Sequence, residues 1–389
     1  MDPCFCRDDI RLCSTDLLPF CYPLSVMALD PKTLADFLAL PVDDVIDVRS
    51  PSEFAEDHIP GAVNLPVLTD DERATVGTIY VQESKFRARK IGAALVAENA
   101  ARHLRTYLAD KPGGYKPLVY CWRGGQRSGA FATILRQVGW PVEVLAGGYR
   151  SFRRLVVAAT HDQPFPAPVV ILEGNTGTAK TEILNRARDL GVQVIDLEAA
   201  ANHRGSLFGG MATPQPSQKT FEARVGLATA ALDPARPVVV ESESNKIGNR
   251  TIPPALWAAM RDAPRIRIEA PLAARAKYLT HAYRDIVENN KLLVEVINRL
   301  RPYQSGETIE GWLKLANAGQ FEALATDLMA RHYDSRYAKH RARMNVTVVE
   351  TIEVADLSEA ALDLAAHQLA RFIGNGLPTL TPAEHLVQA

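Results

Sequence analysis

Residues 169–181 read VVILEGNTGTAKT, so an apolar run leads into a glycine-punctuated loop that ends in Lys180-Thr181. The apolar run predicts a buried strand, and residues 181–190 after the loop predict a helix. A strand, a glycine-rich loop and a helix in this order are typical of phosphate-binding loops, in which main-chain N–H groups at the helix start hold an anion. The segment therefore predicts an α/β domain built around an anion site.

The expected phosphate loop departs from the usual G-x-x-x-x-G-K-[S/T] pattern at one position, where Ala179 replaces the second glycine. Lys180 would neutralise phosphate charge, and Thr181 would offer its hydroxyl to a phosphate or to Mg²⁺. A plain glycine turn before a helix is the simpler alternative. The residues expected to bind a diphosphate are Gly174, Asn175, Thr176, Gly177, Thr178, Ala179, Lys180 and Thr181.

Two further predicted strands, 192–196 and 237–241, continue this α/β unit. The second ends at an acidic residue, which beside a phosphate loop can hold Mg²⁺ through water or act as a base. The aspartate usual there is absent, which weakens the case for nucleotide hydrolysis. The polar loop 203–209 suits an anion or a base, although an ordinary loop is an equal alternative. The candidate substrate or Mg²⁺ contacts are Arg204, Ser206, Glu241 and Glu243.

A second anion-binding loop precedes this domain, where the predicted strand 118–121 delivers Cys121 to the start of the predicted helix 128–138. Converging N–H groups and the helix dipole favour a thiolate there, and two nearby arginines would lower its pKa further. A buried, inert cysteine at a strand end is the simpler alternative. We predict that Cys121 is catalytic and that its loop consists of Trp122, Arg123, Gly124, Gly125, Gln126, Arg127 and Ser128.

The pattern of apolar runs divides the chain into two α/β domains joined by a proline-rich linker. Residues 27–155 form the first domain, 156–168 the linker and 169–373 the second domain, with 374–389 as a loose tail. Alternating strands and helices predict a parallel sheet in each domain. Further predicted elements are strands 45–48, 62–65 and 142–145 in the first domain, and helices 272–289, 291–301, 321–338 and 357–373 with strand 346–350 in the helix-rich end of the second.

Composition places the chain among ordinary globular proteins, with 389 residues, 47% hydrophobic and 23% charged residues and a net charge of −1. The sequence contains no run of about 18 apolar residues, so it predicts no transmembrane helix. Four of the five cysteines lie in residues 1–26, which we interpret as a disordered extension or a start site placed too far upstream. A metal cluster is the alternative, with poor ligand spacing. Without that segment Cys121 is the remaining cysteine, which indicates a reducing cytoplasm.

Four separated pieces of the first domain resemble the rhodanese family of sulfurtransferases. They are residues 47–54, which include Asp47 and Arg49, residues 58–62, the Cys121 loop, and residues 145–148. The resemblance implies that Cys121 cycles through a persulfide or perselenide. It places Asp47 and Arg49 near the loop, where we expect them to brace it rather than to react.

The combination of the two domains resembles the bacterial tRNA 2-selenouridine synthases. The segments that carry this resemblance are the Cys121 loop with Trp122 and residues 174–181, 203–209 and 241–248. The resemblance implies conversion of 2-thiouridine to 2-selenouridine at the wobble position of tRNA. Geranyl diphosphate would first alkylate the sulfur, and selenium from selenophosphate, carried on Cys121 as a selenosulfide, would then replace the S-geranyl group. It further implies no tightly bound cofactor and no certain metal site, with Mg²⁺ as a candidate ligand.

The expected partners follow from that resemblance: tRNA at its anticodon region, geranyl diphosphate, and selenophosphate or the enzyme that makes it. We expect a cytoplasmic monomer that does not bind membranes. Residues 331–343 are rich in cations and tyrosines that suit RNA, and 85–90 and 150–154 are further basic segments, although each alone is more often a solvated helix face. Candidate tRNA contacts are Arg331, Arg336, Lys339, Arg341 and Arg343.

Two other functions fit the same motifs. One is a rhodanese-type sulfurtransferase fused to a small-molecule kinase, which would require ATP. The other is a non-catalytic selenium or sulfur carrier whose phosphate loop senses nucleotide.

Overall fold

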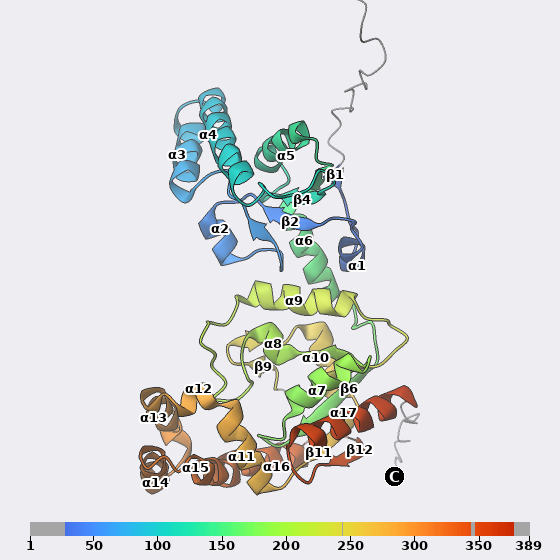
Figure 1. The fold of residues 1–389 in the computed structure, drawn as a ribbon, viewed down its shortest axis with the longest axis vertical. Coiled ribbons are helices and arrows are strands. Elements are labelled where there is room, and N and C mark those ends of the chain that lie inside the picture. The colour runs from blue at the N-terminus through green and yellow to red at the C-terminus, as the bar shows by residue number, and fades with distance from the viewer. Residues whose placement is uncertain (1–27, 243, 344–346, 377–389) are drawn as a thin grey trace, which may run out of the picture.

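The computed structural model describes residues 28–242, 244–343 and 347–376, which form two α/β domains (Figure 1). The N-terminal domain contains a parallel five-stranded sheet in the order β1-β5-β4-β2-β3. Parallel strands require helical crossovers, which cover the sheet here as the sequence predicts. The strands are β1 (Ala28–Leu29), β2 (Asp44–Asp47), β3 (Val63–Asn64), β4 (Pro117–Tyr120) and β5 (Glu143–Leu145).

Six helices accompany this sheet in the described part of the N-terminal domain. Two of them, α3 (Asp70–Gln82) and α4 (Lys85–Arg105), form a helical hairpin at the edge of the domain that the sequence analysis left unassigned (Figure 1). A capping box starts α3: the Thr69 hydroxyl accepts from Glu72 N, and the Glu72 carboxylate accepts from Thr69 N. The others are α1 (Leu34–Leu38), α2 (Pro51–Glu56), α5 (Gln126–Val138) and α6 (Gly148–Val157).

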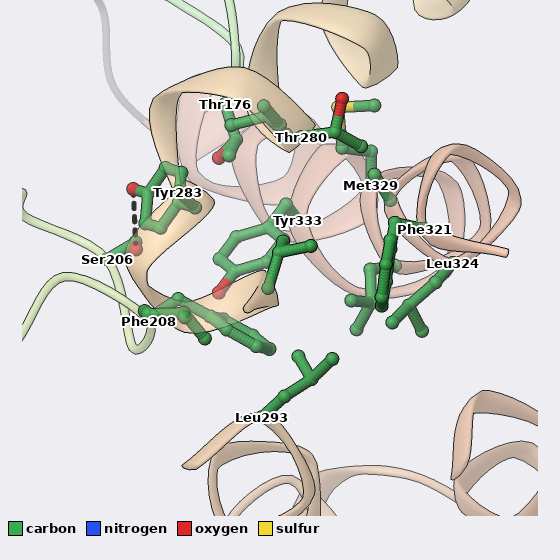
Figure 2. A pocket seen from close by; sticks show the side chains of 15 residues that line it. Thr176, Ser206, Phe208, Thr280, Tyr283, Leu293, Phe321, Leu324, Met329 and Tyr333 are labelled. Atoms are coloured by element: carbon green, nitrogen blue, oxygen red, sulfur yellow. Dashed lines mark hydrogen bonds between the residues drawn. The ribbon is translucent and has the colours of Figure 1, made fainter. Parts of the chain in front are cut away.

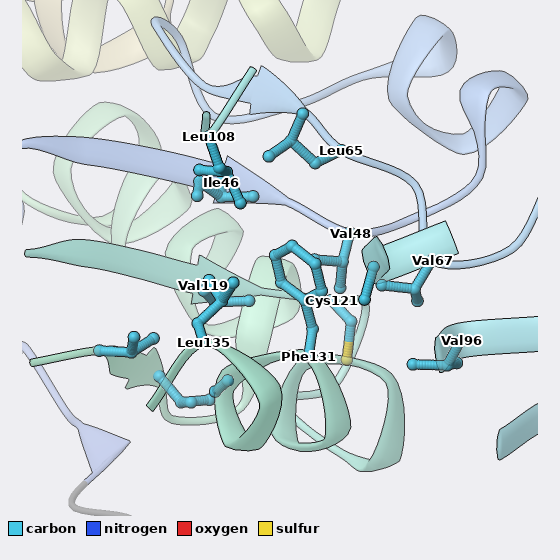
Figure 3. Close-up of a cluster of buried hydrophobic side chains, with 14 of the residues drawn as sticks. Ile46, Val48, Leu65, Val67, Val96, Leu108, Val119, Cys121, Phe131 and Leu135 are labelled. Atoms are coloured by element: carbon cyan, nitrogen blue, oxygen red, sulfur yellow. The ribbon is translucent and has the colours of Figure 1, made fainter. Parts of the chain in front are cut away.

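The core of this domain lies between the sheet and α5. Figure 3 shows Phe131 and Leu135 of α5 beside Ile46 and Val119 of the central strands, with Cys121 next to Phe131 and Val48 in the same cluster. All four apolar side chains are fully buried. The sheet and α5 therefore fix the position of the thiol at the end of β4.

The junction between the domains corrects the predicted linker 156–168. Helix α6 runs directly into a π-helical stretch, η1 (Ala158–Asp162), so only the proline-rich remainder is non-helical. Helix α9 (Gln218–Ala230) of the second domain packs against the first: Thr220 Oγ1 donates to Asp57 Oδ1 at 2.8 Å. The linker prediction was wrong over 156–162 because the apolar face of this helix is covered by the other domain, which proline spacing does not reveal.

The C-terminal domain has a parallel five-stranded sheet in the order β12-β11-β6-β8-β7. The sequence analysis did not identify β11 (Arg265–Glu269), because charged residues alternate with its isoleucines. Arg265 and Arg267 are neutralised by the buried carboxylate of Glu173, at 3.4 and 2.6 Å respectively. The other strands are β6 (Val169–Gly174), β7 (Gln193–Ile195), β8 (Val238–Glu241) and β12 (Val348–Glu353), beside a small antiparallel pair, β9 (Lys246–Ile247) and β10 (Arg250–Thr251).

The helices around this sheet include a helical subdomain after β11, at the lower end of the molecule in Figure 1. The predicted helix 272–289 is in fact two helices, α11 (Leu272–Ala282) and α12 (Arg284–Val287), separated at Tyr283. The sequence analysis missed α14 (Gly306–Asn317), which buries Trp312. The remaining helices are α7 (Lys180–Asp189), α8 (Leu197–Ala201), α10 (Pro254–Arg261), α13 (Asn290–Asn298), η2 (Arg301–Tyr303), α15 (Phe321–Leu328), η3 (Met329–Tyr333), α16 (Asp334–Arg343) and α17 (Glu359–Gly374).

Two predictions about the chain ends fall on residues without a structural description. Segment 1–26 lies outside the described residues, as does most of the predicted tail. Within the described ranges, no helix combines the length and apolar character needed to cross a bilayer.

Candidate functional sites

The predicted thiol loop forms a compact cradle between β4 and α5. Cys121 is buried at the end of β4, with its Sγ 3.2 Å from Ser128 Oγ and 3.3 Å from the donating N–H of Gly125. Burial raises the pKa of the Cys121 thiol, but hydrogen bonds from Ser128 and from the N–H groups of Gly125 and Arg123 outweigh it and lower the pKa below its ordinary value. The site therefore favours a thiolate.

The arginines of the loop act differently from the sequence-based expectation. Arg127 is held by Glu53 in a two-point ion pair, at 2.6 and 3.2 Å, and Glu53 also pairs with Arg73 at 3.1 Å. The Arg123 side chain is exposed, and it is the main-chain N–H of this residue that hydrogen-bonds the sulfur. Arg127 thus keeps an electrostatic interaction with Cys121 while it pairs with Glu53, and Arg123 contributes its main-chain N–H rather than its guanidinium.

Three glycines allow the loop to lie against the turn after β5. Gly124 has a φ of +65°, and a side chain there would approach the carbonyl oxygen of Leu145 to 2.7 Å. Gly148 has a φ of +60°, and its Cβ would lie only 2.1 Å from the Cys121 carbonyl oxygen. Gly147, at φ +69°, starts α6 in the left-handed region. This close approach joins residues 145–148 to the thiol loop and excludes larger side chains at Gly124 and Gly148.

Asp47 and Arg49 brace the Cys121 loop from the interior of the domain. Arg49 Nη2 donates to Asp47 Oδ2 at 2.7 Å and to the Asp57 carbonyl at 2.6 Å, and both charged side chains are fully buried. The Arg49 guanidinium lies 4.5 Å from the centre of the Tyr149 ring, on which the half-exposed Trp122 also stacks. Since neither side chain reaches solvent, the geometry supports the expected bracing role.

The phosphate loop lies between β6 and α7, in the predicted context. Ala179 adopts the left-handed region at φ +54°, which normally favours the glycine that the usual pattern has here. Lys180 Nζ donates across the loop to the carbonyl oxygens of Gly174 at 3.0 Å and Asn175 at 3.5 Å. The ammonium group therefore lies over the mouth of the loop, where a bound phosphate would meet it.

A buried arginine that the sequence analysis missed holds this loop in place. Arg275 of α11 donates from Nη1 to the Thr176 carbonyl at 3.1 Å and pairs with Asp334 through both terminal nitrogens, at 3.0 and 2.7 Å. Gly177, at φ +85°, packs so closely on α11 that a Cβ would lie 2.9 Å from Leu279. An arginine inside an amphipathic helix gives no sequence signal for such a contact.

Acidic side chains lie beside the end of the loop. Thr181 Oγ1 lies 3.0 Å from a Glu198 oxygen and 3.3 Å from a Glu241 oxygen and can donate to either, so the structure brings the predicted Glu241 to the loop and adds Glu198. Glu243 lies outside the described residues. No described group of three or more His, Cys, Asp or Glu side chains could hold a metal. One hydroxyl and two carboxylates do fit Mg²⁺ that keeps water and phosphate oxygens as its other ligands.

The predicted loop 203–209 docks onto the break between α11 and α12. The Arg204 guanidinium lies 4.8 Å from the Tyr283 ring centre and donates to Asp285 at 3.0 Å. Ser206 Oγ lies 3.1 Å from the Tyr283 hydroxyl, and burial raises the pKa of Tyr283 to about 12, so this hydroxyl stays protonated. The protein thus holds Arg204 through Nη2 and the ring contact while its buried Nη1 has no partner in the described part of the chain, and Ser206 lines a cavity that adjoins the phosphate loop.

The candidate tRNA contacts lie on and before α16. Arg331 pairs with Asp327 at 2.8 Å on the surface, and Arg336 stacks over the Tyr303 ring at 5.1 Å. The side chains of Lys339, Arg341 and Arg343 lie outside the described residues. Arg336 and Tyr303 together form a stacked cation–aromatic pair of the kind that binds unpaired bases.

Fold and site together define a class, a rhodanese-like thiol domain joined to a phosphate-loop domain. Comparison with known families agrees: residues 30–155 match the rhodanese-like domain, and residues 167–299 match the tRNA 2-selenouridine synthase AAA domain. The chain belongs to the tRNA 2-selenouridine synthase family of enzymes, as its relatives show.

Three of those relatives, each named tRNA 2-selenouridine synthase, illustrate the similarity. The protein of Bdellovibrio bacteriovorus is 32% identical over 341 residues, which cover 85% of this chain and 83% of the relative. That of Chromohalobacter salexigens is 33% identical over 350 residues, 83% of this chain and 94% of the relative. That of Nitrosomonas europaea is 35% identical over 257 residues, which span 64% of this chain and 66% of the relative, just under two thirds of its length.

Proposed function

We propose that this protein converts 2-thiouridine in the anticodon of tRNA to 2-selenouridine, through an S-geranyl intermediate made from geranyl diphosphate. The observation that carries the proposal is the presence in one chain of a stabilised thiol, Cys121, and a separate phosphate loop with Lys180 over its mouth. The names of the relatives support the product and the tRNA substrate.

The phosphate loop serves the first step. The 2-thiouridine sulfur attacks C1 of the geranyl group, the allylic C–O bond breaks, diphosphate leaves with the bonding electrons, and the N3 proton of the base is lost to solvent. Lys180 and the loop N–H groups stabilise the charge that develops on the leaving oxygen. Bound through Thr181, Glu198 and Glu241, Mg²⁺ would supply further neutralisation of the diphosphate.

The thiol loop serves the second step. Geranylation turns the thiocarbonyl sulfur into a thioether on C2, so that a selenium nucleophile can add at C2 and geranyl thiol can leave. The N–H groups around Cys121 suit an anion such as selenophosphate. We assign this loop to selenium delivery and assign Cys121 the role of selenium carrier.

Nucleoside analysis tests this function directly. A 2-thiouridine tRNA is incubated with the protein, geranyl diphosphate and selenophosphate, then digested and examined by mass spectrometry. We expect 2-selenouridine, and S-geranyl-2-thiouridine when selenophosphate is withheld, with diphosphate released in the absence of ATP. An absolute requirement for ATP would instead support the sulfurtransferase–kinase fusion. Absence of any modified nucleoside would support the non-catalytic carrier.

A further inference from the structure

An apolar cavity lies directly beside the phosphate loop. Its space amounts to about 570 Å³ when the solvent at its open mouth is counted. Thr176 of the loop and Ser206 contribute to its lining, and the other walls come from the helical subdomain (Figure 2). The lining residues are Thr176, Ser206, Phe208, Leu279, Thr280, Tyr283, Ile286, Val287, Leu293, Phe321, Leu324, Ala325, Leu328, Met329 and Tyr333.

The cavity and the phosphate loop share one wall. Gly177 of the loop packs on Leu279 of α11, whose side chain also lines the cavity. The Thr176 side chain points into the cavity in Figure 2, while its carbonyl is held by Arg275. The phosphate loop and the cavity are therefore adjacent, and Thr176 is the loop residue that belongs to both.

The side chains that line the cavity determine which kind of ligand group can bind there. Ten of the fifteen lining residues are aliphatic, methionine or phenylalanine side chains, and the hydroxyls of Ser206 and Tyr283 lie 3.1 Å apart. The buried hydroxyl of Tyr333 also lines the cavity and lacks a hydrogen-bond partner among the described residues. A nucleobase buried here could reach this hydroxyl but would leave most of its ring nitrogens and exocyclic groups without hydrogen bonds, at considerable cost. A hydrocarbon chain has no such requirement and gains from leaving water.

We propose that this cavity binds the hydrocarbon chain of a prenyl diphosphate whose head occupies the phosphate loop, and that its far wall sets the chain length. The inference rests on the proposed function and locates the substrate within it. Figure 2 shows Leu293 on the opposite side of the cavity from Thr176, so Leu293 meets the end of the chain. The aromatic rings of Phe208, Tyr283 and Tyr333 lie between them, where their faces stabilise the allylic cation that develops as diphosphate leaves.

Chain-length selectivity tests this assignment with paired variants. Leu293→Ala lengthens the cavity, and Leu300→Ala is its control, because Leu300 is buried in the same helical cluster but does not line the cavity. Ala325→Phe fills the cavity, and Ala323→Phe is its control on the exposed face of the same helix. For each, kcat/KM is measured with dimethylallyl, geranyl and farnesyl diphosphates and 2-thiouridine tRNA, and folding is checked by thermal unfolding.

The expected shifts have opposite signs. Leu293→Ala should raise the farnesyl-to-geranyl ratio at least tenfold, and Ala325→Phe should raise the dimethylallyl-to-geranyl ratio by a similar factor, since one or a few methylenes in an apolar pocket change selectivity by about 10- to 200-fold. Both controls should keep the wild-type ratios. If Leu293→Ala fails to fold, the dimethylallyl-to-geranyl ratio of Ala325→Phe tests the proposal by itself.

The outcomes separate the two proposals. If the wild type geranylates tRNA but the cavity variants keep its ratios, the chain lies elsewhere and the proposed function stands. If the wild type uses no prenyl diphosphate, both proposals fall.

Discussion

Replacement of Lys180 by alanine tests the division of labour between the two loops. Lys180 is the only lysine or arginine within residues 174–181, and its Nζ lies over the loop carbonyls of Gly174 and Asn175. Arg275, the nearest buried guanidinium described at the loop, is committed to Asp334 and to the Thr176 carbonyl. No second cation is therefore free to replace Lys180 at the leaving diphosphate among these contacts.

The expected loss follows from that geometry. Removing one charge-assisted contact to a group that gains negative charge in the transition state costs about 2–4 kcal/mol. At about 1.4 kcal/mol per factor of ten, geranylation should slow roughly thirtyfold to thousandfold. The ground-state loop should survive, because Arg275 still holds it through the Thr176 carbonyl.

The assay compares two substrates for the same variant. With 2-thiouridine tRNA and geranyl diphosphate, Lys180→Ala should release diphosphate slowly, whereas pre-formed S-geranyl-2-thiouridine tRNA and selenophosphate should still yield 2-selenouridine at the wild-type rate. Lys277→Ala, an exposed lysine on α11, is the matched control and should behave as wild type on both. Equal failure of a folded Lys180→Ala on the pre-geranylated tRNA would refute the reasoning and assign the phosphate loop to tRNA or selenophosphate.

Three further predictions concern the loops themselves. Cys121→Ser should abolish selenium insertion and leave geranylation intact, so that nucleoside analysis shows S-geranyl-2-thiouridine accumulating; normal 2-selenouridine from this variant would exclude the carrier role. Because hydrogen bonds hold the pKa of Cys121 below its ordinary value, its rate of alkylation by iodoacetamide should reach half-maximum at a lower pH than a free cysteine, and Ser128→Ala should move that midpoint upward; an unchanged midpoint would show that the Ser128 contact is not responsible. Ala179→Gly should change the free energy of unfolding by less than about 1 kcal/mol, because relief of left-handed strain offsets the added chain entropy, whereas Ala179→Val should destabilise by more than that; chemical denaturation checks both, and a tolerated valine would contradict the strain argument.

The elements around both loops were predictable from the sequence because each loop follows an uninterrupted apolar strand. Strands 118–121 and 169–173 were expected within one residue of β4 and β6, since buried parallel strands read as continuous apolar runs. The glycines and the cysteine or lysine that follow then fix the chemistry of each loop locally. Short-range patterns were sufficient to predict the structure wherever a residue interacts with others that are only a few positions away in the sequence.

The missed strand and the missed contacts at the phosphate loop depend on distant partners. Strand β11 carries two arginines whose charge is neutralised by Glu173, which lies 92 and 94 residues away from them in the sequence. Glu198 reaches Thr181 across 17 residues, and Arg275 reaches Thr176 across 99. A charged side chain without a visible partner reads as a solvated face, and only the fold shows which ones are buried and paired.

Arg275 connects the phosphate loop to the segment that carries the candidate tRNA contacts. Its guanidinium is buried and bonds both the Thr176 carbonyl and Asp334, the first residue of α16. Removing one partner of a buried ion pair leaves an uncompensated charge, so the two elements keep a fixed relation while the pair is intact. The same helix, α11, provides Leu279 to the cavity wall. The phosphate loop, the apolar cavity and α16 are thus joined through α11, so the proposed sites for the diphosphate, the prenyl chain and the tRNA share one supporting helix.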